Sequence, residues 1–364
     1  MPIHLSHRGR GTIENPPNRF ESTFIVQDDG AWEEIARTDP DFAPRRTPTT
    51  YLRDESRSII SGNSSPDIGF SHSLNPYRGC EHGCAYCYAR PYHEYLGYNA
   101  GLDFETRIMV KDKAPELLEA ELAKKSWQPV ALACSGVTDC YQPLERELEI
   151  TRRCLAVLAD FRNPVGIITK NALVTRDLDL LAELAAHGAA QVVLSLTTLD
   201  PALSSTLEPR ASRPAARLEA MRRLSEAGIP VGVSVAPIIP GLNDHEIPAL
   251  MRAAADHGAS FASGTLLRLP HAVKDIFAAW LDQFAPGKKD LILNRVREVR
   301  GGALNDSTFG QRMNGTGPLA EQIGQLIRIS KRRAGFDERE RNFSHGRLST
   351  KAFRRRMPGQ MELF

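Results

Sequence analysis

The chain has 364 residues, of which 41% are hydrophobic and 25% charged, and this ordinary globular composition excludes a wholly disordered protein. Forty-six Lys and Arg against 44 Asp and Glu leave a formal net charge of +2, too small to indicate a class of partner. Six cysteines are too few for a disulfide scaffold, and no apolar run approaches the roughly 18 residues of a membrane helix.

The first part of the chain, residues 1–65, carries scattered Pro, Gly, Asn and Arg and only short apolar patches such as Phe24-Ile25-Val26. We interpret it as an extended arm that wraps a core or is partly disordered. Its beginning has no apolar signal core, so we expect a cytoplasmic protein with no membrane partner.

Between about residues 66 and 275, short β-branched runs alternate with longer segments of helical period. Nearly continuous apolar runs are typical of strands buried on both faces, and they predict strands at 71–75, 107–110, 130–134, 165–169, 191–196, 231–235 and 261–267. We predict helices at 114–125, 144–160, 176–187, 214–227 and 244–257. Gly188, Gly228 and Gly258 follow three of these helices, as left-handed C-caps do. The repeated helix–glycine–strand order indicates βα units with parallel strands.

About six such units are fewer than the eight of a closed barrel. We therefore predict an α/β fold: a partial (β/α)6 TIM-like barrel with an N-terminal extension and a helical, basic C-terminal region. In such a barrel the chemistry lies in the loops at the carboxyl ends of the strands. The predicted boundaries are 1–65 for the arm, 66–275 for the core barrel, 276–335 for the helical region and 336–364 for a basic, poorly ordered tail.

The C-terminal region contains predicted helices at 276–284, 291–300 and 318–333, with a glycine-rich segment at 309–317. From Arg328 to Arg356 there are eleven Lys and Arg against three acidic residues, a local charge of +8. Two interpretations stay open: a solvated tail, or an arm that binds nucleic-acid phosphates.

Three cysteines fall within eight residues, directly after the predicted strand at 71–75: Cys80, Cys84 and Cys87. Gly79 and Gly83 allow the segment to turn tightly, so that the three sulfurs can face one inorganic centre. Most iron–sulfur cubes take four Cys ligands, but the next cysteine, Cys134, follows 47 residues after Cys87. An iron without a protein ligand can stay open to a substrate or cosubstrate, which distinguishes a catalytic from a closed structural site.

The alternative is a zinc knuckle made of the three cysteines with His82 or His93. Zinc sites usually come as two separated pairs of ligands, and this sequence has no second pair. The spacing therefore favours an iron–sulfur cluster.

The motif Cys80-x3-Cys84-x2-Cys87, with the aromatic Tyr86 before its last cysteine, resembles the cluster motif of the radical S-adenosylmethionine (radical SAM) superfamily. The resemblance implies a [4Fe–4S] cluster whose unique iron binds the amino and carboxylate groups of S-adenosylmethionine (SAM). One electron would break the C5′–S bond of SAM, and the resulting 5′-deoxyadenosyl radical would abstract hydrogen from a substrate. It also implies a one-electron reductant such as flavodoxin or ferredoxin.

Three further segments, 137–145, 169–171 and 208–210, resemble the spore photoproduct lyase-like group, often labelled DNA repair photolyases. Segments 15–21 and 309–313 resemble an uncharacterised bacterial branch of that group. The subgroup resemblance and the basic tail favour DNA or RNA as a partner.

The resemblance also implies contacts to SAM from the cluster motif and the second strand. Tyr86 would pack near the adenine, or it is ordinary packing. Gly136, Thr138 and Asp139 would meet the SAM amino group, although Thr138 and Asp139 could instead cap the helix that follows.

Later strands would supply the remaining contacts. Lys170 would pair with the SAM carboxylate, Ser195 would bond a ribose hydroxyl, and Ala236 would belong to an apolar shelf against the adenine. The alternatives are a solvated Lys170 and a Ser195 that only faces the interior.

Spore photoproduct lyase uses a cysteine as hydrogen donor in a Cys-x-Ser-Asp-like stretch. Aligning that Asp on Asp139 puts Gly136 at the position of the cysteine. Cys134 or Cys140 could donate hydrogen instead, whereas Cys154 in a predicted helix is expected to be inert packing. These residues therefore do not support the thymine-dimer substrate.

Three hypotheses remain: a radical SAM lyase-like enzyme acting on nucleic acid, one acting on a peptide or small molecule, or a nucleic-acid binding protein with a structural metal site. No second Cys-rich segment for auxiliary clusters is present, which argues against the peptide-modifying type.

Overall fold

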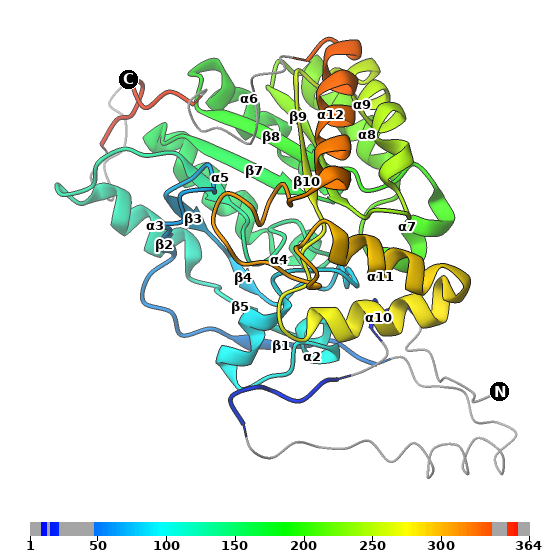
Figure 1. Ribbon diagram of the computed structural model, residues 1–364. Coiled ribbons are helices and arrows are strands. Elements are labelled where there is room, and N and C mark those ends of the chain that lie inside the picture. The colour runs from blue at the N-terminus through cyan, green and yellow to red at the C-terminus, as the bar shows by residue number, and fades with distance from the viewer. Residues whose placement is uncertain (1–8, 13–14, 22–46, 337–347, 356–364) are drawn as a thin grey trace, which may run out of the picture.

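The computed structural model describes residues 9–12, 15–21, 47–336 and 348–355 (Figure 1). Its main sheet has seven strands in the order β10-β9-β8-β7-β6-β3-β2. Their bounds are β2 Ile60–Gly62, β3 His72–Leu74, β6 Leu132–Cys134, β7 Val165–Thr169, β8 Ala190–Ser195, β9 Val231–Ile238 and β10 Phe261–Leu266. Six of them, β3 and β6 to β10, are parallel neighbours in chain order, and β2 pairs antiparallel with β3 at one edge.

The predicted α/β class and parallel sheet are confirmed. Strand β8 is buried along its whole length, and β7 along nearly all of it, which is why the strands appear in the sequence as continuous apolar runs. Within the described residues the sheet is open, with β2 and β10 at its two edges.

The predicted strand at 107–110 belongs to a different sheet. It forms β5 (Arg107–Val110) in a three-stranded sheet of order β1-β5-β4, with β1 at Thr50–Arg53 and β4 at Tyr77–Arg78. Strand β1 lies inside the segment predicted as an arm and pairs in parallel with β5, so part of that segment adds to the folded core.

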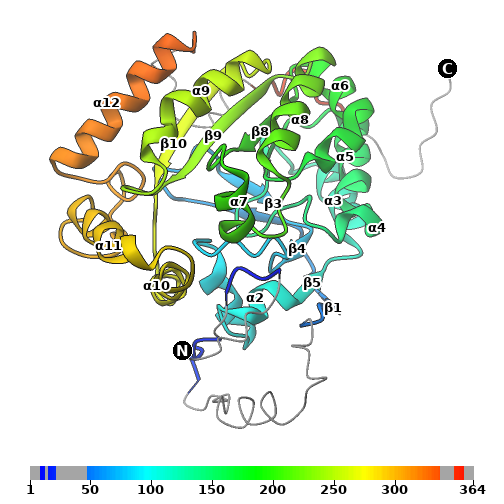
Figure 2. The ribbon, with the colours of Figure 1, turned by 90° about the vertical axis from the view of Figure 1, so that its right-hand side faces the viewer.

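Helices cover the outer face of the main sheet (Figure 2). They are α3 (Ala114–Ala123), α5 (Ile150–Phe161), α6 (Leu178–Ala186), α8 (Pro214–Glu226) and α9 (Ile247–Asp256), all within predicted helical segments to within one or two residues. Gly188, Gly228 and Gly258 follow α6, α8 and α9 with positive φ, as predicted for C-caps.

Three of the short helices that lie outside the predicted segments surround the cysteines. They are a 3₁₀ helix η1 (Arg90–Leu96) and α2 (Leu102–Thr106) after the cysteine motif, and α7 (Pro201–Leu207) after β8. They have too few residues to show an apolar period. All three lie around the segment that carries the cysteines, so they matter to the site below.

The C-terminal helices α10 (Val273–Phe284), α11 (Lys289–Glu298) and α12 (Pro318–Arg333) match the prediction, and α12 packs against α9. No described helix combines the length and the apolar character needed to cross a bilayer.

The loop between α11 and α12 connects the two edges of the main sheet (Figure 1). On the β10 side, the Leu266 N–H donates a hydrogen bond to the Met313 carbonyl at 3.1 Å. On the β2 side, the Arg312 guanidinium pairs with both oxygens of Asp67, which lies between β2 and β3, and Gly310 N–H donates to the same carboxylate at 3.2 Å. We call the contact of Asp67 with Gly310 and Arg312 the clasp.

Residues 348–355 pack at the amino ends of the parallel strands. Ser349 N–H donates to the Gly188 carbonyl before β8 at 2.8 Å, and Arg354 N–H donates to the Phe161 carbonyl before β7 at 2.9 Å. The Phe353 ring lies 6.3 Å from that of Phe161, and an Arg355 guanidinium nitrogen donates to the Trp127 carbonyl at 3.0 Å. The rest of the basic tail, 337–347 and 356–364, lies outside the described residues.

Candidate active site

The three cysteines lie on the cluster loop, residues 79–88, between β4 and η1. Gly79 and Gly83 have φ of 77° and 65°, where a side chain is strained. A Cβ on Gly79 would also lie 2.9 Å from the Phe104 carbonyl oxygen. Both glycines are therefore required for the tight turns that the sequence predicts here.

The thiols of the cluster loop form a donor set that fits a bound cationic centre. Cys80 and Cys87 contact the same apolar group around Phe104, and Cys84 and Cys87 share a second one. Burial raises the pKa of Cys80 well above its usual value and that of Cys84 to about 12, so these sulfurs become ligands only when a metal centre displaces their protons. Among the described residues, no three His, Cys, Asp or Glu side chains converge on one point as a single zinc ion would require.

The two histidines of the zinc alternative have other contacts. His82 Nδ1 lies 3.3 Å from Asp139 Oδ2, and its Nε2 lies 3.4 Å from the Asn171 amide nitrogen. The buried His93 ring packs edge-on against Phe104. His82 is thus engaged by Asp139 and Asn171, which argues against its serving as a zinc ligand.

A buried arginine holds the middle of the cluster loop. The Arg90 guanidinium donates to the Cys84 carbonyl at 3.0 and 2.9 Å and to Glu105 Oε1 at 2.5 Å. The other Glu105 oxygen accepts the Gly11 N–H at 3.0 Å. Arg90 and Glu105 are both fully buried, so the pair orders the loop from inside and ties the described part of the N-terminal segment to it.

A second buried carboxylate holds the start of the cluster loop. Glu81 pairs with Arg210 at 3.1 Å and accepts the Leu144 N–H at 3.1 Å, while its own N–H donates to the Gln142 side chain at 3.0 Å. The segments 137–145 and 208–210, which carry the subgroup resemblance, therefore both meet the cluster loop through one side chain.

Asp139, a predicted SAM contact, joins the ends of β6 and β7. Its carboxylate accepts the Thr169 hydroxyl at 2.7 Å and the Lys170 N–H at 2.9 Å, in addition to facing His82. Burial would raise its pKa, but His82 and these hydrogen bonds lower it to about 2. The Thr138 hydroxyl donates to the Gly79 carbonyl at 2.6 Å, which positions the same segment against the cluster loop.

Lys170 lies between the cluster loop and a buried carboxylate. Its amine stands 5.7 Å from the centre of the Tyr86 ring. Burial alone would lower the pKa of Lys170, but the Cys84 sulfur and Glu208 outweigh it and raise the pKa. Lys170 thus places a positive charge beside the cysteine motif, as the resemblance implies for a partner of the SAM carboxylate.

Glu208 and Arg217 anchor this corner and were not assigned from the sequence. Glu208 accepts the Tyr86 hydroxyl and the Thr197 hydroxyl, the latter at 2.6 Å, and pairs with Arg217. Burial raises the pKa of Glu208, but Arg217 and Lys170 overcome this and lower it to about 2. The only sequence signal was the Glu208-Pro209-Arg210 match, because Arg217 looks like any polar residue of an amphipathic helix.

The remaining predicted SAM contacts lie on β8 and β9. Ser195 is buried at the end of β8; its carbonyl accepts an Arg217 N–H at 2.9 Å, and its hydroxyl makes no hydrogen bond with described residues. Ala236 is partly buried, and its carbonyl accepts the Thr197 hydroxyl at 3.2 Å.

Gly136 has a backbone conformation that disfavours any other residue. Its φ is 125°, which L side chains rarely adopt, although a Cβ there would meet only Phe70 at 3.9 Å. The Gly136 carbonyl accepts the Tyr88 hydroxyl at 2.8 Å. Backbone strain, not lack of space, would therefore oppose a cysteine at this position.

The downstream cysteines lie in the core. Cys134, Cys140 and Cys154 are buried in one apolar cluster, and the Cys140 thiol donates to the Cys134 carbonyl at 3.4 Å. Burial and this hydrogen bond raise the pKa of Cys140 well above its usual value. A hydrogen-donor role for Cys140 or Cys134 stays a prediction.

The comparisons with known proteins agree with this geometry. The family model of the radical SAM superfamily matches residues 74–254. An uncharacterized protein of Mycobacterium tuberculosis is 35% identical over 234 residues, which cover 64% of this chain and 68% of the relative. An uncharacterized protein of Acidianus two-tailed virus is 31% identical over 222 residues, which cover 57% and 71%.

Among solved structures, the structure of this chain is similar to spore photoproduct lyase complexed with dinucleoside spore photoproduct. The TM-score is 0.59 and the identity 16%, over 80% of this chain and 83% of that one. This similarity establishes the fold, with helices packed on a parallel sheet.

Proposed function

The chain belongs to the radical SAM superfamily, and on this premise we propose that its cluster loop and the ends of β6 to β9 form the site where SAM is cleaved. It is an enzyme, and radical SAM enzymes use a [4Fe–4S] cluster and SAM and need an external reductant. A small one-electron carrier, flavodoxin or ferredoxin, is the reductant that we propose.

The observation that carries the proposal is the position of Lys170 against the cysteine motif. When bound, the cluster and SAM supply a one-electron cleavage that yields methionine and a 5′-deoxyadenosyl radical. Cys80, Cys84 and Cys87 would hold three irons and leave the fourth to SAM. Lys170 would then attract the carboxylate of SAM, since its raised pKa keeps its amine charged.

The other site residues would position SAM and exclude water. Ser195 offers a hydroxyl without a partner among the described residues, as a ribose contact needs. The Glu208–Arg217 pair fixes the Tyr86 hydroxyl and so sets the ring plane beside the cluster loop. The segment that would meet the SAM amino group contains Gly136, Thr138 and Asp139. Ala236 would belong to the apolar shelf against the adenine.

We further propose that the substrate is a nucleic acid and the reaction repair-like. Support comes from the segments 137–145 and 208–210, which meet at Glu81, and from the fold shared with a lyase that binds a dinucleoside photoproduct. The φ of Gly136 would strain a cysteine, which argues for a hydrogen donor at another position, and so for a lesion other than the thymine dimer.

Replacing Cys84 tests the enzymatic part. We expect Cys84→Ala to abolish both the brown cluster absorbance and the formation of 5′-deoxyadenosine from SAM, measured after anaerobic reconstitution with a chemical reductant. Cys154→Ala is the matched control: this buried thiol lies in α5, and its loss should leave both signals. SAM cleavage that persists in Cys84→Ala would contradict the proposed site.

Deuterium transfer tests the substrate. The reconstituted enzyme is incubated with uniformly deuterated DNA, RNA or peptide pools, and deuterium in 5′-deoxyadenosine is read by mass spectrometry. We expect label from a nucleic-acid pool; label from peptides alone would favour the peptide alternative and refute ours.

A further inference from the structure

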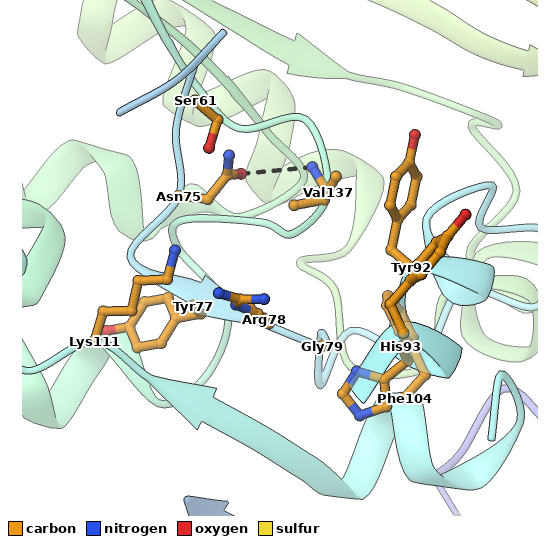
Figure 3. Close-up of a pocket in the computed structure, with 11 residues that line it drawn as sticks. Ser61, Asn75, Tyr77, Arg78, Gly79, Tyr92, His93, Phe104, Lys111 and Val137 are labelled. Carbon is orange, nitrogen blue, oxygen red and sulfur yellow. Dashed lines mark hydrogen bonds between the residues drawn. The ribbon is translucent and has the colours of Figure 1, made fainter. Parts of the chain in front are cut away.

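A cavity of about 230 Å³ lies directly beside the cluster loop, between β4, β5 and η1 (Figure 3). Gly79, which precedes the first cluster cysteine, and Val137, from the predicted SAM-binding segment, both line it. Its polar lining includes Ser61, Asn75, Arg78, Tyr92, His93 and Lys111. Arg78, Lys111, Ser61 and Tyr92 have no role in the site described above.

Lys111 carries an unpartnered charge in this cavity. The residue is 7% exposed, and its amine makes no hydrogen bond or ion pair with any described residue. Burial lowers the pKa of Lys111, and the Arg78 charge lowers it further, against an opposing effect of Asp54. Removing a cation from water is unfavourable, and Asp54 offsets this cost for Lys111 only in part, so a bound anion would lower the cost further.

The one nearby carboxylate is already in use. Asp54 pairs with the Arg78 guanidinium at 2.7 Å and accepts the Ser56 hydroxyl at 2.5 Å. Arg78 and Lys111 therefore bring two positive charges to the cavity against a single negative charge. The excess is one positive charge next to the cluster loop.

Neutral hydrogen-bonding groups complete the lining. His93 is 1% exposed, and its Nε2 has no partner. In Figure 3 the Lys111 amine, the Arg78 guanidinium and the polar end of Asn75 surround one space, with Tyr92 on its opposite side. Two cations with several neutral donors match the many acceptor oxygens of a phosphate better than the two of a carboxylate.

We propose that this cavity binds a phosphate group of the substrate through Lys111 and Arg78. As a substrate contact the inference rests on the proposed function, whereas phosphate binding itself rests on the cavity alone. A phosphate held here would lie against Gly79 and Val137, so the group attached to it would be directed along the cluster loop.

Calorimetric titration of the anaerobically reconstituted protein with inorganic phosphate tests the site, at fixed ionic strength. Lys111→Met keeps the length of the side chain and removes its charge, so we expect at least tenfold weaker binding. Lys113→Met is the matched control, because Lys113 is exposed two residues further along, and we expect its affinity to equal that of wild type. Equal affinities for wild type and Lys111→Met, or acetate binding as tightly as phosphate, would overturn the proposal.

A folding check keeps the result of the titration interpretable. Melting temperature reports folding: Lys111→Met should melt at or above wild type in phosphate-free buffer, since it removes an unpaired buried charge. If it melts well below wild type, Lys111 is stabilised by other groups and the anion site is wrong.

The source of the phosphate is resolved by comparing a 5′-phosphorylated dinucleotide with the same dinucleotide lacking the terminal phosphate. Lys111-dependent binding of either form supports the site, at a terminal or a backbone phosphate respectively. SAM cleavage is measured in parallel on wild type. Cleavage without phosphate binding refutes the cavity alone, and Lys111-dependent phosphate binding without cleavage refutes the proposed function alone.

Discussion

Gly11 makes the closest approach to the cluster loop of any glycine in the described residues. A Cβ on Gly11 would lie 1.4 Å from the Gly83 carbonyl oxygen, a distance that no side chain tolerates. Its N–H is also the donor to Glu105, the buried partner of Arg90. The cluster loop is thus closed from outside by backbone alone, and glycine is required on both sides of the contact.

We expect Gly11→Ala to push this segment away from the cluster loop. Overpacking of this kind costs about 1–3 kcal/mol, so the free energy of unfolding should fall by that amount and the cluster should be lost faster to a chelator. Gly62→Ala is the control, because nothing lies within 4 Å of a Cβ there. Equal chelator sensitivity of Gly11→Ala and wild type would show that the segment does not protect the cluster.

His93 gives a pH dependence whose sign follows from its burial. Burial lowers the pKa of His93 to about 4 from 6.5, so protons bind preferentially to the unfolded chain as the pH falls below 6.5. The stabilising contribution of neutral His93 is therefore fully present above pH 6.5 and is lost as the pH falls toward 4. Between pH 6.5 and 5 this loss lowers the free energy of unfolding by about 1.5 kcal/mol. Chemical denaturation at these two pH values should show a smaller loss in His93→Gln. An equal loss in both proteins would place the titration elsewhere.

The sequence predicts best the positions of those site residues that follow from local spacing. The cysteine motif and Lys170 at a strand end were recognisable because their positions follow from local spacing and from the parallel-strand rule. Glu208 and Arg217 meet only after α8 has folded back on β8, and nothing local marks a buried arginine within an amphipathic helix. The unpaired amine of Lys111 is likewise a property of its surroundings.

Helix α8 is the element that the site depends on for its electrostatics. Arg217 is fully buried on its inner face and donates to Glu208 and to the carbonyls of Ser195 and Ser212. The helix thereby joins the end of β8 to the carboxylate that positions Tyr86.

We expect Arg217→Met to destabilise the protein by about 3–5 kcal/mol, because it leaves Glu208 buried with a weakened counter-charge. Arg222→Met on the exposed face of α8 should leave the free energy of unfolding nearly unchanged, since its pairs with Glu219 and Glu226 are solvent-exposed. Urea unfolding of both variants measures the difference. A small effect for Arg217→Met would mean that Glu208 takes up a proton or that Lys170 suffices.

At the level of elements, apolar runs predicted the parallel strands well, because both faces of each strand are covered. The predicted helix 144–160 is instead divided into α4 (Glu145–Leu148) and α5 at Glu149, whose φ is 52°. The Glu145 carboxylate accepts the Thr151 N–H at 3.1 and 3.0 Å, so a buried side chain replaces helical continuity. Such a break is invisible in the pattern, since the apolar period continues across it.

The described part of the tail, residues 348–355, packs at the ends of the parallel strands that lie opposite the cysteines. Residues 348–355 contact the segments that precede β6, β7 and β8, whereas the site lies at the opposite ends of these strands. In this segment the Arg354 and Arg355 guanidinium groups donate to the carbonyls of Asp160 and Trp127.

Removing residues 337–364 should separate a structural from a nucleic-acid role of the tail. We expect the free energy of unfolding to fall by about 1–3 kcal/mol, from the lost hydrogen bonds and the Phe353–Phe161 contact, while SAM cleavage is retained. Binding of DNA or RNA should weaken and depend less steeply on salt. Unchanged binding and salt dependence would reject the phosphate-binding arm.

The clasp has a consequence for how the protein is made. Asp67 and Arg312 are separated by 245 positions in the sequence. The clasp therefore cannot connect the β2 side of the sheet to the β10 side until the ribosome has synthesised the loop after α11. At 5–20 residues per second, this interval after Cys87 emerges lasts roughly 10–45 s. Contact between the two sides of the sheet is therefore a late step, made only after all seven strands of the main sheet in the described residues have been synthesised.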